Sequence, residues 1–417
     1  VNIYLSMQEL IIVTRIFSGI EDALVSNHWE HSGTPAYYHF IRKLDLNDKF
    51  VYKLYLLSPN AIGNNKYRKV SFDNLNVTAQ VIPYYSIIFS SYSSFIKKIE
   101  FFYNKFIQYA LVLVQTYNHK CYYIDRDNIL LSFILLKISK YNVVITRLLG
   151  VPPGLYEHLT CRNNIYSKII RWVFDNNRSY FICTNDGSFA EATKEKIKNN
   201  RFYLLFNGVD KGFTSVSNNK KENSEIITIS YISRIVAVKG HINFIKSLGK
   251  LKEKDRFRVY IIGDGELKEK CQRLVKSYGL DDNIIFTGRL THSESMNYLC
   301  NSDILIAINY DGSFGNSVLE AAHMGIPVVT LAHKSFSKEK YPFFKFIDNN
   351  GKIDEYLAVF IEKFVHSKPL QDSMSKKSIE FSNSNLLDWD ERINAELDII
   401  LDLCKRNTER CLSPQNL

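Results

Sequence analysis

Short apolar runs rich in β-branched residues alternate with segments of helical period along most of the chain, and few folds accommodate that pattern. The alternation is typical of parallel βαβ units, because two parallel strands need a crossover, usually a helix, between them. It is cleanest from residue 226 onward, where Ser233, Gly263 and Gly288 directly follow strands. The strands predicted in this half are Ile226–Ile232, Arg258–Ile262, Ile284–Thr287, Ile304–Ile308 and Pro327–Leu331.

The first half of the chain repeats the alternation less regularly. Segment Ser58–Val81 is rich in Asn and weakly periodic, so it is predicted to form loops with at most one short strand. The strands predicted elsewhere in this half are Glu9–Thr14, Cys121–Asp125, Asn142–Thr146, Ser179–Cys183 and Phe202–Phe206. The predicted helices are Pro35–Leu44, Phe95–Tyr109, Asn128–Ser139, Ile165–Phe174 and Ser188–Lys198.

A chain of 417 residues exceeds one ordinary compact domain and suits two. The polar, charged run Ser215–Ser224 is typical of a linker or an exposed loop at a domain boundary. The sequence therefore predicts an α/β fold of two facing Rossmann-like domains with a cleft between them, over residues 1–206 and 207–385. Apolar residues at helical spacing predict a further helix at about 386–417, which either completes the second domain or crosses back to brace the first.

The chain carries 53 Lys and Arg against 43 Asp and Glu, a net charge of +10. That balance favours an anionic partner, and it leaves nucleic acid, a phosphorylated small molecule and an acidic membrane surface open. Seven scattered Cys without a CxxC or CxxH pair argue against a disulfide framework and structural zinc. Free thiols in a reducing cytosol are the simpler interpretation.

The longest purely apolar runs, such as Ala110–Val114, are far shorter than the roughly 18–20 residues of a membrane span. The first 15 residues lack the basic and long apolar regions of a signal peptide. We therefore expect a cytoplasmic protein that does not cross a membrane.

Two cations stand near the end of the strand Ile226–Ile232. Arg234 follows the strand, and Lys239 comes five residues later, just before a predicted helix. In open α/β sheets ligands bind beyond the carboxyl ends of the strands, and a helix N-terminus adds partial positive charge there. The pair predicts a site for a phosphate or diphosphate, with two unrelated surface cations as the alternative.

The turn Gly263-Asp264-Gly265 begins like a dinucleotide-binding fingerprint, but Lys268 stands where the third Gly is required. No acidic residue follows in the register that would read a ribose. An NAD site is therefore not expected. A tight turn that allows a ligand to approach closely is expected instead.

A glycine-punctuated loop after Ile304–Ile308 opens a helix at about Asn316. The N–H groups of Gly315, Asn316 and Ser317 would form an anion cradle. Glu320 lies one turn into this apolar helix, where a buried carboxylate is costly unless it is paired. Two vicinal hydroxyls of a ligand would pair it, and the alternative is a Glu that merely favours the helix N-terminus.

Phe95–Tyr109 combines apolar residues at helical spacing with Lys97, Lys98 and Lys105. It predicts either an interfacial helix on an anionic membrane or a helix packed on the sheet with a basic solvent face. Nucleic-acid binding has no motif in this chain, so no nucleic-acid partner is expected.

Five groups of residues follow one another in the second half of the chain. They are Asn207-Gly208-Val209-Asp210, Ser233-Arg234 with Lys239-Gly240, Ile262-Gly263-Asp264-Gly265, Phe286-Thr287-Gly288, and Phe314-Gly315-Asn316 with Leu319-Glu320-Ala321. In this order and spacing, from about Asn207 to Leu331, the chain resembles the family 4 glycosyltransferases. The resemblance implies the GT-B fold, a nucleotide-sugar donor and retention of anomeric configuration. Upstream, Gly33-Thr34-Pro35, Asp125-Arg126 and Arg147 to Gly150 only suggest members that build bacterial surface polysaccharides.

The resemblance also implies roles for the matching residues. Arg234 and Lys239 would bind the diphosphate and stabilise the leaving nucleotide, while Glu320 would hold the ribose hydroxyls. Arg289 and its neighbours would lie against the base, and Ser32-Gly33-Thr34 would face the donor phosphate and the acceptor. The implied catalytic residues are Arg234, Lys239, Asp311 and Glu320. The implied donor-binding residues are Gly33, Thr34, Gly263, Gly288, Arg289, Leu290, Phe314, Gly315, Asn316 and Ser317. No metal or cofactor is expected, because two cations and a helix N-terminus supply the electrostatic stabilisation.

Two departures from the family pattern stand out. An acidic residue usually lies eight positions before the family's Glu, but Gly312 occupies that place and Asp311 comes one residue earlier. A single inserted residue, such as Ser313, would restore the reach of Asp311. The family also often has a His near the end of the strand matching Asn142–Thr146, where this chain has Arg147-Leu148-Leu149-Gly150. None of the ten His has a partner identifiable from the sequence, and each is predicted to be a surface residue.

The sequence thus predicts a retaining glycosyltransferase that moves a sugar from a UDP- or GDP-linked donor to a growing, lipid-linked glycan such as a surface polysaccharide. It would work in the cytoplasm, at the inner face of the cell membrane. Two alternatives stay open. One is a nucleotide-sugar epimerase on the same fold, whose Arg-Pro-Glu and His-Gly-Asp motifs are absent here. The other is a non-catalytic, nucleotide-binding partner of a glycosyltransferase, which the two departures would allow.

Overall fold

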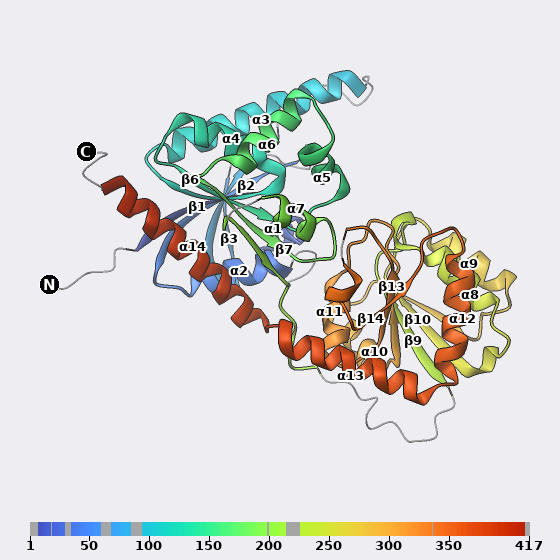
Figure 1. The fold of residues 1–417 in the computed structure, drawn as a ribbon. Coiled ribbons are helices and arrows are strands. Elements are labelled where there is room, and N and C mark those ends of the chain that lie inside the picture. The colour runs from blue at the N-terminus through green and yellow to red at the C-terminus, as the bar shows by residue number, and fades with distance from the viewer. Residues whose placement is uncertain are drawn as a thin grey trace.

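The computed structural model describes residues 7–17, 19–29, 35–59, 68–84, 94–197, 200–213, 226–335 and 337–412. Within them the chain forms two α/β domains, each built on its own sheet (Figure 1). The predicted α/β fold of two facing Rossmann-like domains is confirmed. Ser32-Gly33-Thr34 and the predicted boundary run Ser215–Ser224 lie outside the described residues.

The first domain has a sheet of eight described strands that is parallel except at one edge. Their spatial order is β3 (Arg68–Phe72), β4 (Leu75–Ile82), β2 (Phe50–Leu57), β1 (Gln8–Arg15), β5 (Cys121–Asp125), β6 (Val143–Leu148), β7 (Ser179–Thr184) and β8 (Phe202–Leu205). Only β3 runs antiparallel to its neighbour, with Val70 opposite Ala79.

Helices cover both faces of this sheet, which is why its central strands are continuous apolar runs. The helices are α1 (Ile20–Ser26), α2 (Pro35–Asp45), α3 (Ser94–Thr116), α4 (Ile129–Ile138), α5 (Pro153–Thr160), α6 (Ile165–Asp175) and α7 (Ala190–Lys196). Leu10 and Ile12 belong to the core that α2 covers. Ile11 and Val13, which alternate with them along β1, belong to the core that α4 and α6 cover.

The prediction for Ser58–Val81 was wrong, because this region contributes both strands of the β3–β4 hairpin. Strand β2, just before it, was not predicted at all. Its first half alternates between buried and exposed residues, whereas its second half, Leu54–Leu57, is buried throughout. Strand β2 therefore shows neither the alternation of a half-buried strand nor the continuous apolar run of a fully buried strand over its whole length, so its sequence has no clear period.

The second domain has a sheet in which all described strand pairs are parallel. The order is β11 (Ile284–Gly288), β10 (Phe257–Ile262), β9 (Ile227–Ile232), β12 (Ile304–Ile306), β13 (Val328–Leu331) and β14 (Phe344–Ile347). The surrounding helices are α8 (His241–Gly249), α9 (Lys268–Ser277), α10 (His292–Cys300), α11 (Asn316–His323) and α12 (Ile353–Val365). Five strands agree with the prediction within two residues at each end. The four-residue edge strand β14 was missed because it is too short to show a period.

Two long helices end the described chain. Helix α13 (Lys368–Asn385) packs on the second domain, where Phe381 joins its core. Helix α14 (Trp389–Leu412) then runs to the first domain (Figure 1). There Ile393 and Leu397 join the core on the α2 side. Of the two arrangements open for the tail, the structure has the one that crosses back.

Among the described residues, two segments pass between the domains, 207–213 and 386–389, and we call this pair of segments the double crossover. The two segments pack against each other, since Val209 N donates to Leu387 O at 3.0 Å. A Cβ added at Gly208 would lie 2.7 Å from Trp389 Cα, so only glycine fits this contact. The two segments therefore form one close-packed connection.

A buried ionic network ties α14 to the first domain. Glu396 on α14 contacts Arg147 Nε of β6 at 3.2 Å and Arg392 Nη1 at 2.6 Å, and it accepts a hydrogen bond from the Tyr123 hydroxyl. All three charged side chains are 2% exposed or less. Arg147 is the first residue of the stretch 147–150, where the family pattern often has a His, and its side chain is committed to this network.

Candidate functional site

A cavity of about 1100 Å³ lies between the two domains. Its first-domain wall includes Tyr38, His39 and Arg42, whose spacing of three or four residues places them on one face of α2. The opposite wall consists of the loop after β11 and the first turns of α10 and α11. The double crossover closes one side, through residues such as Lys211 and Trp389.

Five of the predicted site residues line this cavity together. Arg289 and Leu290 follow β11, while Asn316, Ser317 and Glu320 belong to α11. They reach the same cavity because both segments begin at the carboxyl ends of parallel strands, which meet at one edge of the sheet. The sequence order alone separates the two groups by some 26 residues, and the parallel sheet brings them together.

Glu320 is paired in a way that the sequence did not reveal. Its side chain is 4% exposed, and its Oε1 lies 2.8 Å from Nε2 of His292, the first residue of α10. The hydrogen bond with Glu320 raises the pKa of His292 above its usual value, against the effect of burial. The sequence identified no partner for any His and predicted each to be a surface residue. This prediction is wrong for His292, which is partly buried against Glu320, and for His241, which is 1% exposed.

A second group of predicted residues forms a charged cluster where the domains meet. Lys239 is partly buried, and burial lowers its pKa while the carboxylate of Asp311 acts in the opposite direction. Arg234 and Asp186 also interact electrostatically with Lys239. Burial raises the pKa of Asp186 to about 6, and Asp311 adds to that effect. The cluster thus places two cations and two carboxylates close together.

Helix α11 begins close to this cluster, because the N–H of Phe314, two residues before its first residue, donates to Asp186 O at 2.7 Å. No side chain caps the helix among the described residues. Its N-cap is Gly315, in extended conformation, and Asn316 is the first helical residue. The Asn316 side chain accepts a hydrogen bond from Asn207 Nδ2 at 2.6 Å, which ties the helix to the double crossover. Uncapped N–H groups at a helix start favour an anion, and the anion cradle at Gly315, Asn316 and Ser317 stays a prediction.

Gly263 and Gly288 both adopt positive φ, at 137° and 76°. A Cβ at Gly263 would lie 2.1 Å from Ser233 O, so this glycine lets its turn pass directly against the backbone of the Ser233-Arg234 loop. Gly263 N also donates to Gly288 O at 2.9 Å. The close approach at Gly263 is thus made by the protein's own backbone.

The structure explains the family departure at Gly312. This residue has φ of 79°, and a Cβ here would lie 2.3 Å from His333 Nδ1 and 2.5 Å from Ser335 Oγ. No carboxylate side chain fits that position without a rearrangement. Asp311 accepts hydrogen bonds from the backbone N of Ser313 at 3.0 Å and from its hydroxyl at 2.7 Å, so its carboxylate turns back onto the loop.

Phe314 and its loop contact the first domain. Phe314 N donates to Asp186 O at 2.7 Å, and Ser335 Oγ donates to Gly187 O at 2.6 Å. The Phe314 ring, 8% exposed, packs with Tyr341 in the second-domain core. The side chain of Phe314 is thus absent from the described wall of the cavity, although it was predicted to contact the donor.

Three features of the site were not predicted. The α2 wall and Asp186 belong to the first domain, and no sequence pattern pairs them with the second. For His292 the sequence did contain a partial signal. Thr291 and Glu294 form the Thr-x-x-Glu capping box that marks a helix start. That motif identifies His292 as the first residue of a helix, but not as the partner of Glu320.

The arrangement suits a ligand with a negatively charged end and vicinal hydroxyls. The cations and the α11 N-terminus would hold an anion, and the Glu320 carboxylate would accept from hydroxyls. Among the described residues, no group of three or more His, Cys, Asp or Glu side chains is placed to hold a metal ion. The described helices likewise include none with the length and apolar character of a membrane span.

Comparisons with known proteins find similarity to glycosyltransferases. Residues 212–381 match the family model described as glycosyl transferases group 1. A 2-deoxystreptamine N-acetyl-D-glucosaminyltransferase from Niallia circulans is 27% identical over 104 residues, which are 25% of this chain and 27% of that protein. An alpha-monoglucosyldiacylglycerol synthase from Streptococcus pneumoniae is 30% identical over 118 residues, 27% of this chain and 25% of that protein. The chain thus spans about a quarter of the length of these relatives.

Solved structures match over nearly the whole chain. A sucrose-phosphate synthase from Thermosynechococcus elongatus superposes with a TM-score of 0.66 at 14% identity, over 95% of this chain and 100% of that one. Anabaena HepE, solved in complex with UDP and glucose, gives 0.63 at 13% identity, over 95% and 99% of the two chains. At these identities the likeness concerns the fold, which is that of the GT-B glycosyltransferases.

Proposed function

We propose that the protein is a glycosyltransferase that binds a UDP- or GDP-linked sugar in the cleft and transfers the sugar to a glycan acceptor. The observation that carries the proposal is the position of Glu320. Its buried carboxylate lines the cavity on the helix whose N-terminus lies beside the charged cluster that contains Arg234 and Lys239. A nucleoside diphosphate has the matching sequence of groups, because ribose hydroxyls and a diphosphate lie next to each other.

The comparisons support this donor class. The family model covers the segment that contains Arg234, Lys239 and Glu320. HepE was solved with UDP, and the two curated relatives are a glycosyltransferase and a glycolipid synthase by name. In this chain we place the base against Arg289 and Leu290, the ribose at Glu320 and the diphosphate between Arg234, Lys239 and the start of α11.

The chemistry proposed at this site retains anomeric configuration. The acceptor hydroxyl attacks from the face that the nucleotide leaves, and a phosphate oxygen of the donor accepts the acceptor's proton. The two cations stabilise the charge that develops on the leaving diphosphate, so no metal is required. Transfer that persists after treatment with a chelator, and an NMR spectrum showing the donor's anomeric configuration in the product, would support this mechanism.

Replacing Glu320 by alanine tests the donor site. We expect nucleotide binding to weaken by roughly 10- to 100-fold, because hydrogen bonds to a charged group contribute about 1.5–3 kcal/mol. The measurement is calorimetric titration with UDP and, separately, GDP. Glu269→Ala, at an exposed position on α9, is the matched control.

The wild type should bind one of the two nucleotides and release it from a sugar donor when an acceptor is present. Binding of neither nucleotide would contradict the proposal. Binding without transfer, across a broad panel of donors and acceptors, would favour the non-catalytic alternative.

We further propose that the acceptor is lipid-linked and that α3 brings the enzyme to an anionic membrane face. Between residues 99 and 108, helix α3 buries polar side chains against its domain and exposes apolar ones. Asn104 and Gln108 are buried, whereas Phe102 is 60% and Phe106 72% exposed. Gln108 Nε2 donates to the backbone O of Ser58 at 2.9 Å, so polar contacts hold the inner face.

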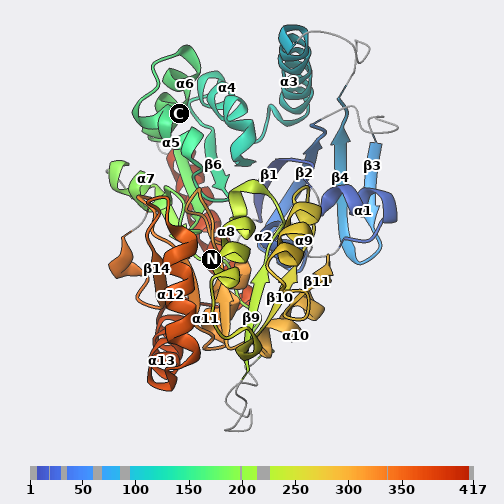
Figure 2. The ribbon, with the colours of Figure 1, turned by 90° about the vertical axis from the view of Figure 1, so that its right-hand side faces the viewer.

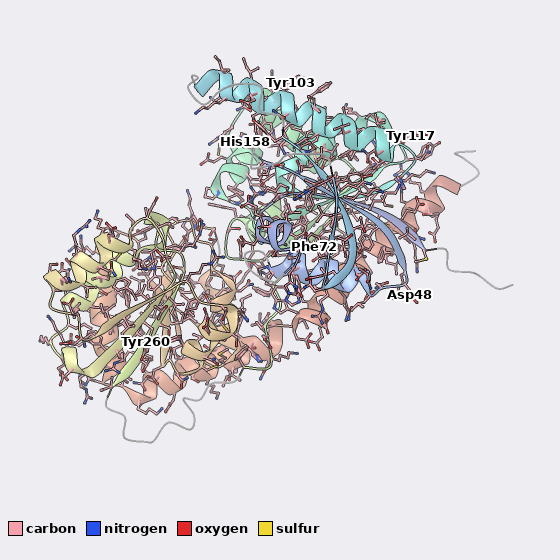
Figure 3. The ribbon with its side chains drawn as sticks, turned by 180° about the vertical axis from the view of Figure 1, so that it is seen from behind. Asp48, Phe72, Tyr103, Tyr117, His158 and Tyr260 are labelled. Atoms are coloured by element: carbon pink, nitrogen blue, oxygen red, sulfur yellow. The ribbon has the colours of Figure 1, made fainter. Side chains whose placement is uncertain are left out.

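The outer face of α3 has the composition of an interfacial helix. Ile99, Phe102, Tyr103 and Phe106 recur at helical spacing, and Figure 3 shows Tyr103 at the outer edge of the molecule. In the views of Figures 1 and 2 the N-terminal part of α3 projects beyond the other helices of its domain. Exposed Lys97 and Lys98 lie on the same part of the helix. Aromatic residues with adjacent cations suit the headgroup region of an anionic bilayer.

Vesicle co-sedimentation tests this contact. The wild type should bind vesicles that contain phosphatidylglycerol and bind pure phosphatidylcholine much more weakly. Phe102→Ser and Phe106→Ser should each lower the partition coefficient by on the order of tenfold, because each ring loses a buried area in the bilayer. Val359→Ser, an exposed apolar position on α12, should change nothing. Equal binding by all four proteins would rule α3 out as the membrane contact.

A further inference from the structure

The contact between His292 and Glu320 joins two helices at the wall of the nucleotide cavity. Nε2 of His292 and Oε1 of Glu320 are 2.8 Å apart, and both residues line the cavity. Glu320 is 4% exposed and His292 31% exposed. The carboxylate therefore has one oxygen engaged with the protein while its residue still faces the space where a ligand would lie.

The position of His292 is set by the local structure of α10. Thr291 is the N-cap, its hydroxyl accepts from Glu294 N, and Glu294 Oε2 accepts from Thr291 N at 2.8 Å. These reciprocal bonds determine where α10 begins, and His292 is its first residue. The ring of Phe213 packs edge-on against the imidazole, with centroids 6.2 Å apart. His292 is thus held in place independently of Glu320.

Glu320 needs a donor. It lies among Val318, Leu319, Ala321 and Ala322, which are all buried. A buried carboxylate in such surroundings is unfavourable unless it accepts hydrogen bonds. In the part of the chain that the structure describes, His292 is the residue whose side chain donates to this carboxylate, and no donor contacts Oε2. The contact with His292 therefore occupies Oε1 and leaves Oε2 for another donor.

We propose that His292 is a positioning residue of the ribose site, which holds Oε1 of Glu320 so that Oε2 accepts from a ribose hydroxyl. The inference rests on the proposed function, since it needs a nucleotide in the cavity. It assigns a role to a residue outside the motifs that resemble the family. It also makes a specific statement about the ligand, because the contribution of His292 passes through the ribose hydroxyls and not through the base or the phosphates.

A hydroxyl-specific comparison follows from this arrangement. If His292 orients Glu320, loss of His292 weakens the binding of ribonucleotides. It has little effect on the binding of deoxynucleotides without the hydroxyl that donates to Glu320. If His292 only supports the fold of the cavity wall, its loss weakens the binding of both kinds of nucleotide equally. The variant His292→Gln distinguishes the positioning role from the structural role further, since the Nε2 amide of glutamine can replace the imidazole N–H as the donor.

The experiment is calorimetric titration of wild type, His292→Ala and His292→Gln with UDP, with GDP, and with the 2′-deoxy and 3′-deoxy counterparts of whichever nucleotide binds. We expect His292→Ala to lower the affinity for the ribonucleotide by roughly 5- to 30-fold. The affinity for the deoxy counterpart that lacks the contacted hydroxyl should fall by less than about twofold. His292→Gln should recover affinity to within about threefold of wild type. His366→Ala, at an exposed His outside the described lining of the cavity, is the matched control and should bind as wild type does.

Three results would overturn the inference while leaving the proposed function intact. They are unchanged ribonucleotide affinity in His292→Ala, equal losses for the ribonucleotide and both deoxy counterparts, and failure of His292→Gln to recover binding although it folds. A wild type that binds neither UDP nor GDP overturns the proposed function and the inference together.

Discussion

Replacing Lys239 by alanine is expected to lower the rate of sugar transfer by about 100- to 1000-fold, the range found when one preorganised donor is removed from a developing negative charge. Lys239 is partly buried and lies in the cluster with Arg234 and Asp311. In the proposed mechanism its ammonium stabilises the charge that grows on the diphosphate as the sugar bond breaks, and water would not fully replace it in a desolvated site. The rate constant at saturating donor should therefore fall more than the affinity for the donor.

The measurement is steady-state transfer with varied donor concentration, which separates the rate at saturation from the Michaelis constant. Lys270→Ala, at an exposed position on α9 of the same domain, is the control and should leave both quantities unchanged. A change confined to the Michaelis constant would mean that Lys239 binds the ground state only. An unchanged rate and affinity would remove Lys239 from the site.

Replacing Glu396 by alanine is expected to lower the stability of the first domain by about 3–5 kcal/mol, because removal of one partner leaves uncompensated buried charge. Here two cations are affected, since Glu396 contacts both Arg147 and Arg392, and the Tyr123 hydroxyl loses its acceptor as well. Detachment of α14 would also release one segment of the double crossover. We therefore expect the loss of stability to be accompanied by a changed relation between the domains.

Urea unfolding followed by circular dichroism checks this prediction, with the transition of the first domain analysed by itself because two domains need not unfold together. Asp402→Ala on the same helix is the control. Its partner Arg406 is 69% exposed, and such a surface pair contributes less than about 1 kcal/mol. Equal losses in the two variants would show that the buried network contributes no more than a surface pair.

The fold was predictable to the extent that its strands are short, apolar and separated by helices. The alternation indicated two parallel-sheet domains, and the clean second half located five of its six described strands. The failures have a common cause. In β2 the burial changes from one face to both within eight residues, and β14 has only four residues, so neither presents a period. Their identity as strands depends on neighbours that come from elsewhere in the chain.

The candidate site was predictable where a single segment supplies the geometry. The start of α11 could be located from its glycines, and Glu320 follows from its place one turn later. The Glu320–His292 contact had no such signal, because the two residues are 28 positions apart and meet only when α10 and α11 pack side by side. Gly312 is comparable, since His333 and Ser335, which exclude a side chain there, come from another loop.

The sequence by itself determined the α/β class, the two-domain organisation and the segments of the second domain that reach the cleft, because these depend on local periodicity and on the polarity of parallel strands. Only the tertiary structure decided that α14 returns to the first domain, that Arg147 serves its attachment, and that His292 holds Glu320. Each of these is a contact between residues far apart in the chain. Their pairing depends on shape and burial in the assembled molecule, which local patterns do not encode.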